Sequence, residues 1–491
     1  MLKRTKIVEN GLAGLRLWAG IGLALFILLI SGTGSYGAVV LPSVIGNNMV
    51  LQRSAKVALW GKAKPNVRVV IITSWNKKRY TVQAGRDSTW KALVQTPRAG
   101  GPYEVSFNDG QLTTLHNILI GEVWVCSGQS NMEMPMQGFY NQPVLHSNDI
   151  IMAAANPEIR LIRYERALSR TPKFDCPSTG WVVSDGPSAK LFSAVGYQFA
   201  QMLQEKLKVP VGMIMSTWGG TMIEGWMPTE SFSAFPEIKV RPASASDTTA
   251  MIKNEPSVLF NAMIQPFVGY GIKGVLWYQG EQNRVNPQIY DRLLTSMVSD
   301  WRALWKAGSW PFYYVQIAPY KYVDKLGPAN LLREAQLKAS HMIPNAGMVV
   351  SMDVGAKHFI HPPNKTLISK RLLYWALAND YGFKGIAYAS PEFKSMQVDK
   401  ETAHISFTHS PKGLSSFGQE LTAFEMAGAD HKFYPAAAKI TGKGVDVHCD
   451  KVPEPVAVRY GFKDWAEGHL FSSEGLPVGP FRTDEWQNAE K

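Results

Sequence analysis

The sequence contains few cysteines, and their positions exclude two common kinds of small-domain architecture. Only Cys126, Cys176 and Cys449 occur in 491 residues, and they lie far apart. They form no CxxC pair and no other recognisable metal-ligand spacing. The sequence therefore predicts neither a zinc site nor a disulfide framework.

The sequence also lacks a block of lysine and arginine with interleaved aromatic residues. The formal net charge is +12, but the basic residues are scattered along the chain. Nucleic-acid binding is therefore not expected. Hydrophobic residues make up 45% and charged residues 18%, which is typical of folded globular proteins.

Long apolar runs are missing after the first 30 residues. The run from Leu17 to Ile30 follows Lys3, Arg4, Lys6 and Arg16 and gives way to small residues up to Ala38. We interpret residues 1–38 as a cleaved signal peptide, so we expect an exported protein, periplasmic or extracellular, without a stable membrane span. The alternative is an uncleaved anchor, although about 14 apolar residues are short for a bilayer that needs roughly 20.

The length and the changing periodicity predict several domains. Residues 39–117 consist of short β-type runs, such as Val57–Trp60, separated by turn residues, and predict an N-terminal β-sandwich-like domain. Residues 118–385 alternate strand-like and helical stretches and predict the catalytic α/β domain. Residues 386–491 lose the helical period and predict a β-rich C-terminal module.

The middle segment has the pattern of a parallel sheet covered by helices on both faces. The predicted strands are Ile118–Cys126, Val209–Thr217, Ile272–Gln279, Phe312–Ala318 and Gly347–Asp353, and the predicted helices are Phe192–Leu207, Tyr290–Trp305, Leu331–His341 and Lys365–Asn379. This is a doubly wound α/β fold. In such sheets ligands bind beyond the carboxyl ends of the strands, so residues that follow each strand are the candidate site.

A candidate nucleophile, Ser130, follows the first of these strands. Gly128 permits a tight turn there, and Ser130 would stand at the mouth of the sheet. A serine hydroxyl needs a nearby base and hydrogen-bond donors for the oxyanion that develops. Met132 stands where the second glycine of a Gly-x-Ser-x-Gly elbow would be, which argues against the α/β-hydrolase fold.

The ends of the next two strands supply candidate donors. Gly219 and Gly220 follow the second strand, and paired glycines let a backbone N–H approach a ligand. The third strand leads into Trp-Tyr-Gln-Gly-Glu-Gln-Asn, in which Gln279 can donate its amide and Glu281 could hold a histidine. Plain turns and solvated loop residues are the alternative interpretations of both segments.

The fifth strand end supplies the imidazoles. Asp353 and then His358 and His361 follow it, and imidazole suits a base that accepts and returns a proton near neutral pH. A single histidine is usually structural. However, a nucleophile, donors and a base at neighbouring strand ends together indicate acyl transfer.

Taken together, these motifs resemble the sialate O-acetylesterases, a branch of the SGNH hydrolases. The resemblance rests on Gly128-Gln-Ser-Asn131, Trp218-Gly-Gly220, Trp277-Tyr-Gln-Gly-Glu281, Ile360-His-Pro362 and Gly475-Leu-Pro-Val-Gly-Pro-Phe-Arg482. It implies a flavodoxin-like three-layer SGNH hydrolase domain with a parallel sheet, flanked by β modules.

The resemblance also implies roles for individual residues. Ser130 would be the nucleophile and His361 the base, with oxyanion donors from the backbone of Ser130, of Gly220 or Gly219, and from a third-strand amide. That amide is Gln279, with Asn283 as the alternative.

The acid of the site departs from the pattern of the superfamily. Members of the superfamily often have an aspartate three residues before the catalytic histidine. In this sequence the position three residues before His361 is His358. Three possibilities therefore stay open: the acid is Asp353, the acid is Glu281, or the site is a Ser–His dyad steadied by a backbone carbonyl. The dyad is possible because the role of the acid is to orient the imidazole and stabilise its cation.

The expected function is removal of O-acetyl groups from sugars, above all sialic acids, by a serine esterase. This chemistry requires neither a metal nor an organic cofactor, and its partner is an acetylated sugar or glycan. One alternative is an esterase for acetylxylan or another glycan. Another is non-catalytic carbohydrate binding by a degenerate esterase.

Overall fold

The computed structural model describes residues 38–241 and 252–486. The predicted signal peptide lies outside the described residues, except for its last position. In the described segments no helix is both long and apolar enough to cross a membrane.

The central sheet has the order β9-β8-β10-β7-β11-β12-β13. Neighbouring strands are parallel, except that β9 runs antiparallel to β8. For the five strands predicted from the sequence the order is 2-1-3-4-5, as in open doubly wound sheets, and the predicted α/β class is confirmed. The strands are β7 (Leu112–Gly128), β8 (Asn156–Arg163), β9 (Val182–Ser184), β10 (Val211–Thr217), β11 (Gly274–Tyr278), β12 (Phe312–Val315) and β13 (Ala346–Val349).

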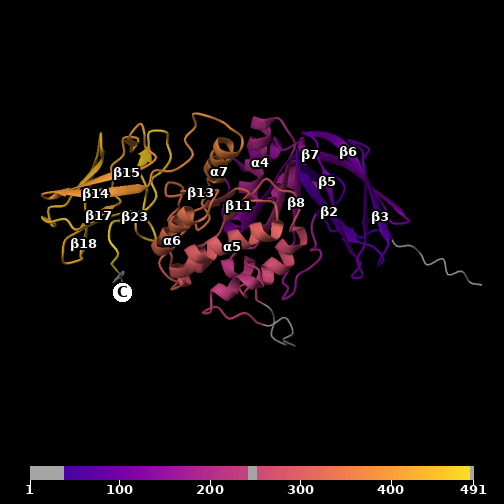
Figure 1. The fold of residues 1–491 in the computed structure, drawn as a ribbon. Coiled ribbons are helices and arrows are strands. Elements are labelled where there is room, and N and C mark those ends of the chain that lie inside the picture. Colours follow the sequence, from indigo (N-terminus) through magenta and orange to yellow (C-terminus); the bar gives the residue numbers. More distant parts are fainter. Residues whose placement is uncertain (1–37, 242–251, 487–491) are drawn as a thin grey trace, which may run out of the picture. The chain divides into compact units, whose positions relative to one another are not determined.

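Helices cover both faces of this sheet, because successive side chains of each buried strand point to opposite sides. Val125 packs with residues of α5 and α6, whereas Trp124 and Cys126 pack with residues of α4 and α7. Figure 1 shows α4 and α7 on one side of the sheet and α5 and α6 on the other. The α-helices are α1 (Ser130–Glu133), α2 (Ser147–Met152), α3 (Gly186–Leu191), α4 (Ala194–Leu207), α5 (Tyr290–Trp305), α6 (Ala329–Met342) and α7 (Lys365–Asp380). Short 3-10 helices lie at Ile223–Trp226, Thr229–Ala234, Gln265–Phe267, Glu281–Val285 and Pro287–Ile289, and a π-helix lies at Phe260–Ile264.

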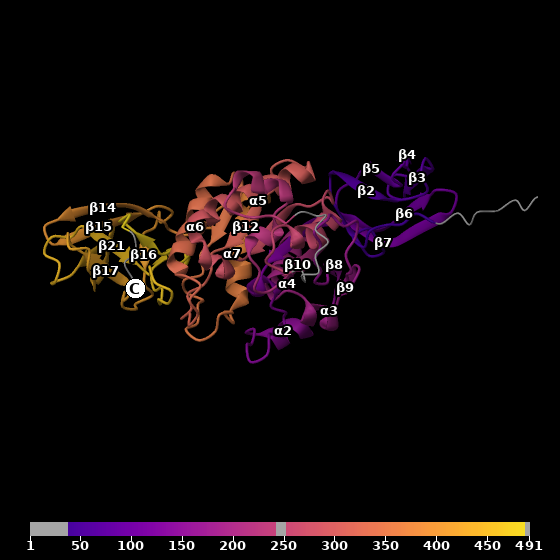
Figure 2. The same cartoon turned by 90° about the horizontal axis from the view of Figure 1, so that it is seen from below.

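Strand β7 is much longer than predicted and belongs to two sheet regions. Its first half pairs antiparallel with β6, and its second half, from Glu122, pairs parallel with β10 (Figure 2). The predicted boundary between residues 117 and 118 therefore falls inside a continuous strand. The preceding strands are β1 (Val50–Gln52), β2 (Lys56–Lys62), β3 (Arg68–Thr73), β4 (Arg79–Gln83), β5 (Thr89–Gln95) and β6 (Gly100–Asn108).

The chain after α7 is built of short antiparallel strands around its own apolar cluster. They are β14 (Phe393–Asp399), β15 (Thr402–Phe407), β16 (Leu414–Ser415), β17 (Phe424–Ala427), β18 (Phe433–Pro435), β19 (Ala437–Thr441), β20 (Gly444–His448), β21 (Ala457–Tyr460), β22 (Phe471–Ser472) and β23 (Phe481–Arg482). The described residues, 38–241 and 252–486, all belong to one compact unit. The division into three domains therefore stays a prediction.

Candidate active site

Ser130 is held at the carboxyl end of β7 by a turn that only glycine permits. Gly128 has a φ of 133°, and a Cβ atom there would lie 2.2 Å from the carbonyl oxygen of Tyr278 on β11. Ser130 then begins helix α1. Its hydroxyl is half-buried and has no hydrogen-bond partner among the described residues. The hydroxyl is thus available to a substrate.

His361 lies on the loop between β13 and α7, and one hydrogen bond joins this loop to the nucleophile turn. Asn131 Nδ2 donates to the carbonyl oxygen of Ile360 at 3.1 Å. Since Asn131 follows Ser130 and Ile360 precedes His361, the predicted nucleophile and base stand on segments that are in direct contact.

The partner of the imidazole is an amide. Gln142 Oε1 lies 2.5 Å from His361 Nδ1, and the ring of Phe139 packs edge-on at 5.1 Å between centroids. An amide oxygen only accepts hydrogen bonds, so with this orientation Nδ1 carries the hydrogen and Nε2 keeps its lone pair. Burial, and secondarily the ammonium of Lys365, lower the pKa of His361 to about 4. The imidazole is therefore neutral, as a base must be, at neutral pH.

The predicted glycine turn lies directly against the predicted nucleophile. A Cβ atom on Gly219 would lie 3.1 Å from Ser130 Cβ. The Gly219 N–H itself donates to Glu133 Oε2 at 2.7 Å. By contrast, the backbone N–H groups of Ser130 and Gly220 have no acceptor within the described parts of the chain. These two groups can serve a developing oxyanion.

The two predicted side-chain donors are fully buried and already hydrogen-bonded to residues of the loops after β10 and β11. Gln279 Nε2 donates to Thr221 O at 2.9 Å and to Asn283 Oδ1 at 2.7 Å. Asn283 Nδ2 donates to Glu224 Oε2 at 2.8 Å and to Asn286 Oδ1 at 3.1 Å. Both hydrogens of each amide are thus in use, and these side chains tie the loops after β10 and β11 together.

The two candidate acids have other partners than the imidazole. Asp353 forms a bidentate pair with Arg371, with distances of 2.8 and 2.6 Å. Glu281 accepts a hydrogen bond of 2.6 Å from Asn131 Nδ2, and burial raises its pKa. In residues 38–241 and 252–486 no carboxylate forms an ion pair or hydrogen bond with His361.

A cavity of about 370 Å³ opens beside α1 at the ends of β8 and β10. Its walls carry charges of both signs, and Arg166, with 54% of its side chain exposed, pairs with Glu133 at 2.7 Å. The lining residues are Glu133, Pro135, Phe139, Arg163, Tyr164, Glu165, Arg166, Leu191, Met215 and Thr217. Because Glu133 also binds the glycine turn, this cavity adjoins the nucleophile.

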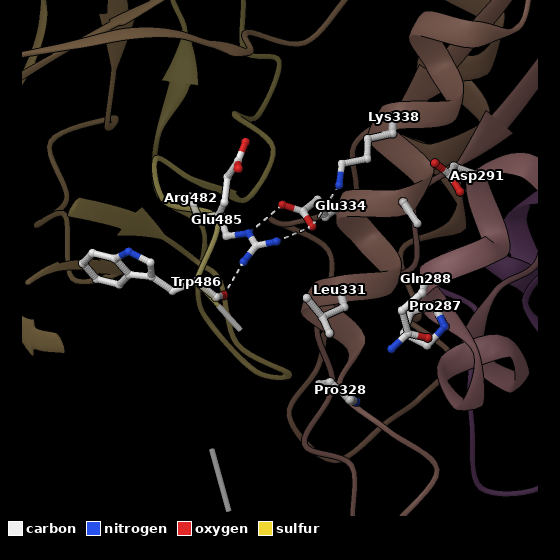
Figure 3. A pocket seen from close by; sticks show the side chains of 11 residues that line it. Pro287, Gln288, Asp291, Pro328, Leu331, Glu334, Lys338, Arg482, Glu485 and Trp486 are labelled. Carbon is white, nitrogen blue, oxygen red and sulfur yellow. Dashed lines mark hydrogen bonds and ion pairs between the residues drawn. The ribbon is translucent and has the colours of Figure 1, made fainter. Parts of the chain in front are cut away.

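A larger cavity of about 720 Å³ lies elsewhere, between α6 and the C-terminal strands. Figure 3 shows Arg482 between Glu334 of α6 and the backbone of Trp486, with bonds of 2.7 and 2.9 Å to the Glu334 carboxylate. None of the predicted site residues lines either cavity, but Glu133, which lines the smaller one, is bonded to Gly219 of the predicted glycine turn. We therefore place the site beside Ser130 and not in the larger cavity.

Three residues of the site were missed by sequence reasoning. Gln142 lies on an irregular loop without any periodic signal, Lys365 resembles an ordinary residue at a helix start, and Arg166 lies in a loop after β8, a strand that was not predicted. Asn131 belongs to the Gly-Gln-Ser-Asn motif, but the sequence alone indicated no role for it. His358, the residue at the usual acid position, is exposed.

In the described segments no group of three or more His, Cys, Asp or Glu side chains could hold a metal ion. A serine with a free hydroxyl, backbone donors and a neutral histidine at the carboxyl edge of an open sheet are the groups expected of an α/β esterase. The chain belongs to the sialic acid-specific acetylesterases, a carbohydrate esterase family whose model matches residues 120–370.

Relatives of known activity cover nearly the whole chain. Human sialate O-acetylesterase is 27% identical, covering 89% of this chain and 91% of the human one. The mouse enzyme is also 27% identical, with 89% and 93% covered. The crystal structure of a carbohydrate acetylesterase from Xanthomonas citri is 33% identical and superimposes with a TM-score of 0.82, covering 91% of this chain and all of that one. The predicted family is confirmed, and the chain is a carbohydrate esterase that removes O-acetyl groups from sugars.

Proposed function

We propose that this enzyme is an SGNH-type, flavodoxin-like serine esterase in which Ser130 attacks the acetyl group and His361 is the base. The observation that carries the proposal is the Asn131–Ile360 hydrogen bond, which joins the nucleophile turn to the base loop at 3.1 Å. This contact supports the proposal that the free hydroxyl of Ser130 and the lone pair of His361 Nε2 belong to one site.

The reaction follows from these groups. Ser130 Oγ attacks the ester carbonyl carbon while His361 Nε2 takes the hydroxyl proton. The N–H groups of Ser130 and Gly220 bind the oxyanion. The C–O bond to the sugar then breaks, and His361 returns its proton to the leaving sugar oxygen. Water, deprotonated by His361, attacks the acetyl-serine, which releases acetate and restores Ser130.

We infer a Ser–His dyad in which Gln142 does the orienting work of the usual acid. Gln142 fixes the tautomer of His361 through Nδ1 but, as a neutral amide, stabilises the imidazolium less than a carboxylate would. Asp353 pairs with Arg371 and Glu281 accepts a hydrogen bond from Asn131, so in this proposal neither carboxylate orients the imidazole directly.

We propose acetylated sialic acids as substrates. The relatives named sialate O-acetylesterases support this choice, and so does Arg166, whose exposed guanidinium in the cavity beside α1 can pair with a sugar carboxylate. The second candidate is a neutral glycan such as acetylxylan. It is consistent with the relative from Xanthomonas citri, which is described as a carbohydrate acetylesterase with no particular sugar specified.

The test is hydrolysis of O-acetylated N-acetylneuraminic acid, acetylxylan and p-nitrophenyl acetate by the purified chain. We expect the highest kcat/KM with the sialic acid, and at least a thousandfold loss in Ser130→Ala and His361→Ala. His358→Ala is the matched control, because His358 is exposed on the same loop. Absence of hydrolysis with all three esters would instead support a carbohydrate-binding protein.

We also propose that the chain is exported after removal of residues 1–38, on the basis of the basic and apolar N-terminal pattern. Expression of the full chain in a bacterium and N-terminal sequencing of the periplasmic fraction tests this. A mature N-terminus near Val39 is expected, and full-length chain in the membrane fraction would contradict it.

A further inference from the structure

Three side chains from different segments form a buried polar chain beneath the site. Lys365 Nζ donates to Asn131 Oδ1 at 2.5 Å, and Asn131 Nδ2 donates to Glu281 Oε1 at 2.6 Å. The exposed fractions of Lys365, Asn131 and Glu281 are 0%, 1% and 4%. The chain thus links the start of α7, the nucleophile turn and the loop after β11 without access to water.

This placement of Lys365 is costly for stability. Lys365 is the first residue of α7, where the helix dipole disfavours a cation, and it is completely buried. Glu281 Oε2 is also buried and has no hydrogen-bond partner among the described residues. An unfavourable buried charge arrangement next to a reactive centre indicates a functional constraint.

Lys365 determines how the amide of Asn131 is oriented. An ammonium group only donates hydrogen bonds, so it must face the oxygen of the amide. The NH₂ group then points to Glu281 and to the carbonyl oxygen of Ile360. Lys365 therefore fixes the hydrogen bond that joins the loop of His361 to the turn of Ser130.

The ammonium also acts on the imidazole through its charge. After burial, the charge of Lys365 is the second cause of the lowered pKa of His361. Of the other charged groups, Glu281 faces Lys365, and Arg284 lies near Glu281. The centroid of the Tyr278 ring lies 5.4 Å from Lys365 Nζ. Among these groups, Lys365 is the one whose positive charge lowers the pKa of His361.

We propose that Lys365 is a positioning residue of the esterase, which holds the base loop against the nucleophile turn through Asn131. The inference rests on the proposed function, because it assigns His361 as the base.

The test compares Lys365→Met with Lys370→Met, which makes the same change at an exposed position of the same helix. The pH dependence of kcat/KM is measured with p-nitrophenyl acetate, and active sites are counted by fluorophosphonate titration. In Lys365→Met we expect the acid limb to move upward by about one pH unit, because the repelling charge is gone. Per active site, kcat should fall about tenfold with KM nearly unchanged, because the reacting groups lose alignment. Lys370→Met should behave like the wild type.

A purely structural role for Lys365 would lower the number of active sites and leave the acid limb in place, and that result would overturn the proposal. If Lys365→Met does not fold, Lys365→Gln keeps a polar group at the site and carries the same expectation. If neither variant folds, Lys365 is required for the fold itself, and that result would also overturn the proposal. A wild type that hydrolyses no ester would refute the proposed function instead.

Discussion

Asn131 and Ile360 are 229 residues apart in the sequence, yet Asn131 Nδ2 donates a hydrogen bond of 3.1 Å to the Ile360 carbonyl oxygen. Each residue is the direct neighbour of a proposed reacting residue, Ser130 or His361. The bond therefore brings the ends of β7 and β13 to one site, although β11 and β12 separate these strands in the sheet.

Gln142 should matter for catalysis more than either candidate acid. Replacing it with leucine removes the acceptor at His361 Nδ1, so the imidazole loses its fixed tautomer. We expect kcat to fall by about ten- to a hundredfold, measured with p-nitrophenyl acetate. Gln137→Leu, an exposed position on the same segment, is the control. Full activity of Gln142→Leu would show that another group orients the ring.

Asp353 should contribute to stability and not to the chemical step. Asp353→Ala leaves the buried guanidinium of Arg371 without its bidentate partner, which costs about 3 kcal/mol of unfolding free energy in comparable cases. Guanidinium chloride unfolding measures this loss, with the exposed Asp399→Ala as control. If Asp353→Ala instead reduces kcat per active site a thousandfold at unchanged stability, Asp353 is the acid of a triad.

Arg166 should distinguish charged from neutral substrates. In Arg166→Gln we expect KM for O-acetylated N-acetylneuraminic acid to rise by about tenfold, because a charge-assisted hydrogen bond to the carboxylate is lost. The kcat/KM for p-nitrophenyl acetate should change less than about threefold, since that ester carries no carboxylate. An equal loss of kcat/KM with both esters would mean that Arg166 acts through Glu133 on the glycine turn.

The buried His361 should make the fold less stable in acid. Its pKa is about 4 in the folded protein against 6.5 for the free side chain, so between these values the unfolded chain binds more protons. This stabilising contribution is fully present above pH 6.5 and is lost as the pH falls toward 4, by up to about 3 kcal/mol.

Denaturant unfolding at pH 7 and pH 4 tests this linkage. The wild type should lose more unfolding free energy between these two pH values than His361→Gln does, because glutamine does not titrate. His358→Gln, at an exposed position, should follow the wild type. An identical loss in all three proteins would contradict a lowered pKa of His361.

Periodicity predicted the catalytic sheet well, because its strands and helices carry strong local patterns. Tyr290–Trp305 was predicted with its observed bounds, and all five predicted strands are present. Strand β8 was missed because the local sequence pattern of its segment is weak. In the structure this strand pairs with β10. The continuous strand β7 hides the expected boundary after residue 117, since one strand can serve two sheets without any break in its β pattern.

Side-chain partners were harder to predict than strand ends. The sequence indicates that Gln279 and Asn283 follow β11, but their orientation depends on Thr221 and Glu224, which follow a different strand. In the same way, the pairing of Asp353 with Arg371 depends on how α7 packs against the sheet. Such contacts arise only after the elements have assembled.

The most direct test of the Ser130–His361 site is covalent labelling of the purified chain with a fluorophosphonate, followed by peptide mass spectrometry. The reagent reacts with a serine that an adjacent base activates. We predict a single adduct on Ser130, which disappears in Ser130→Ala and is strongly slowed in His361→Ala. An adduct on another serine, or unchanged labelling in His361→Ala, would contradict this assignment of nucleophile and base.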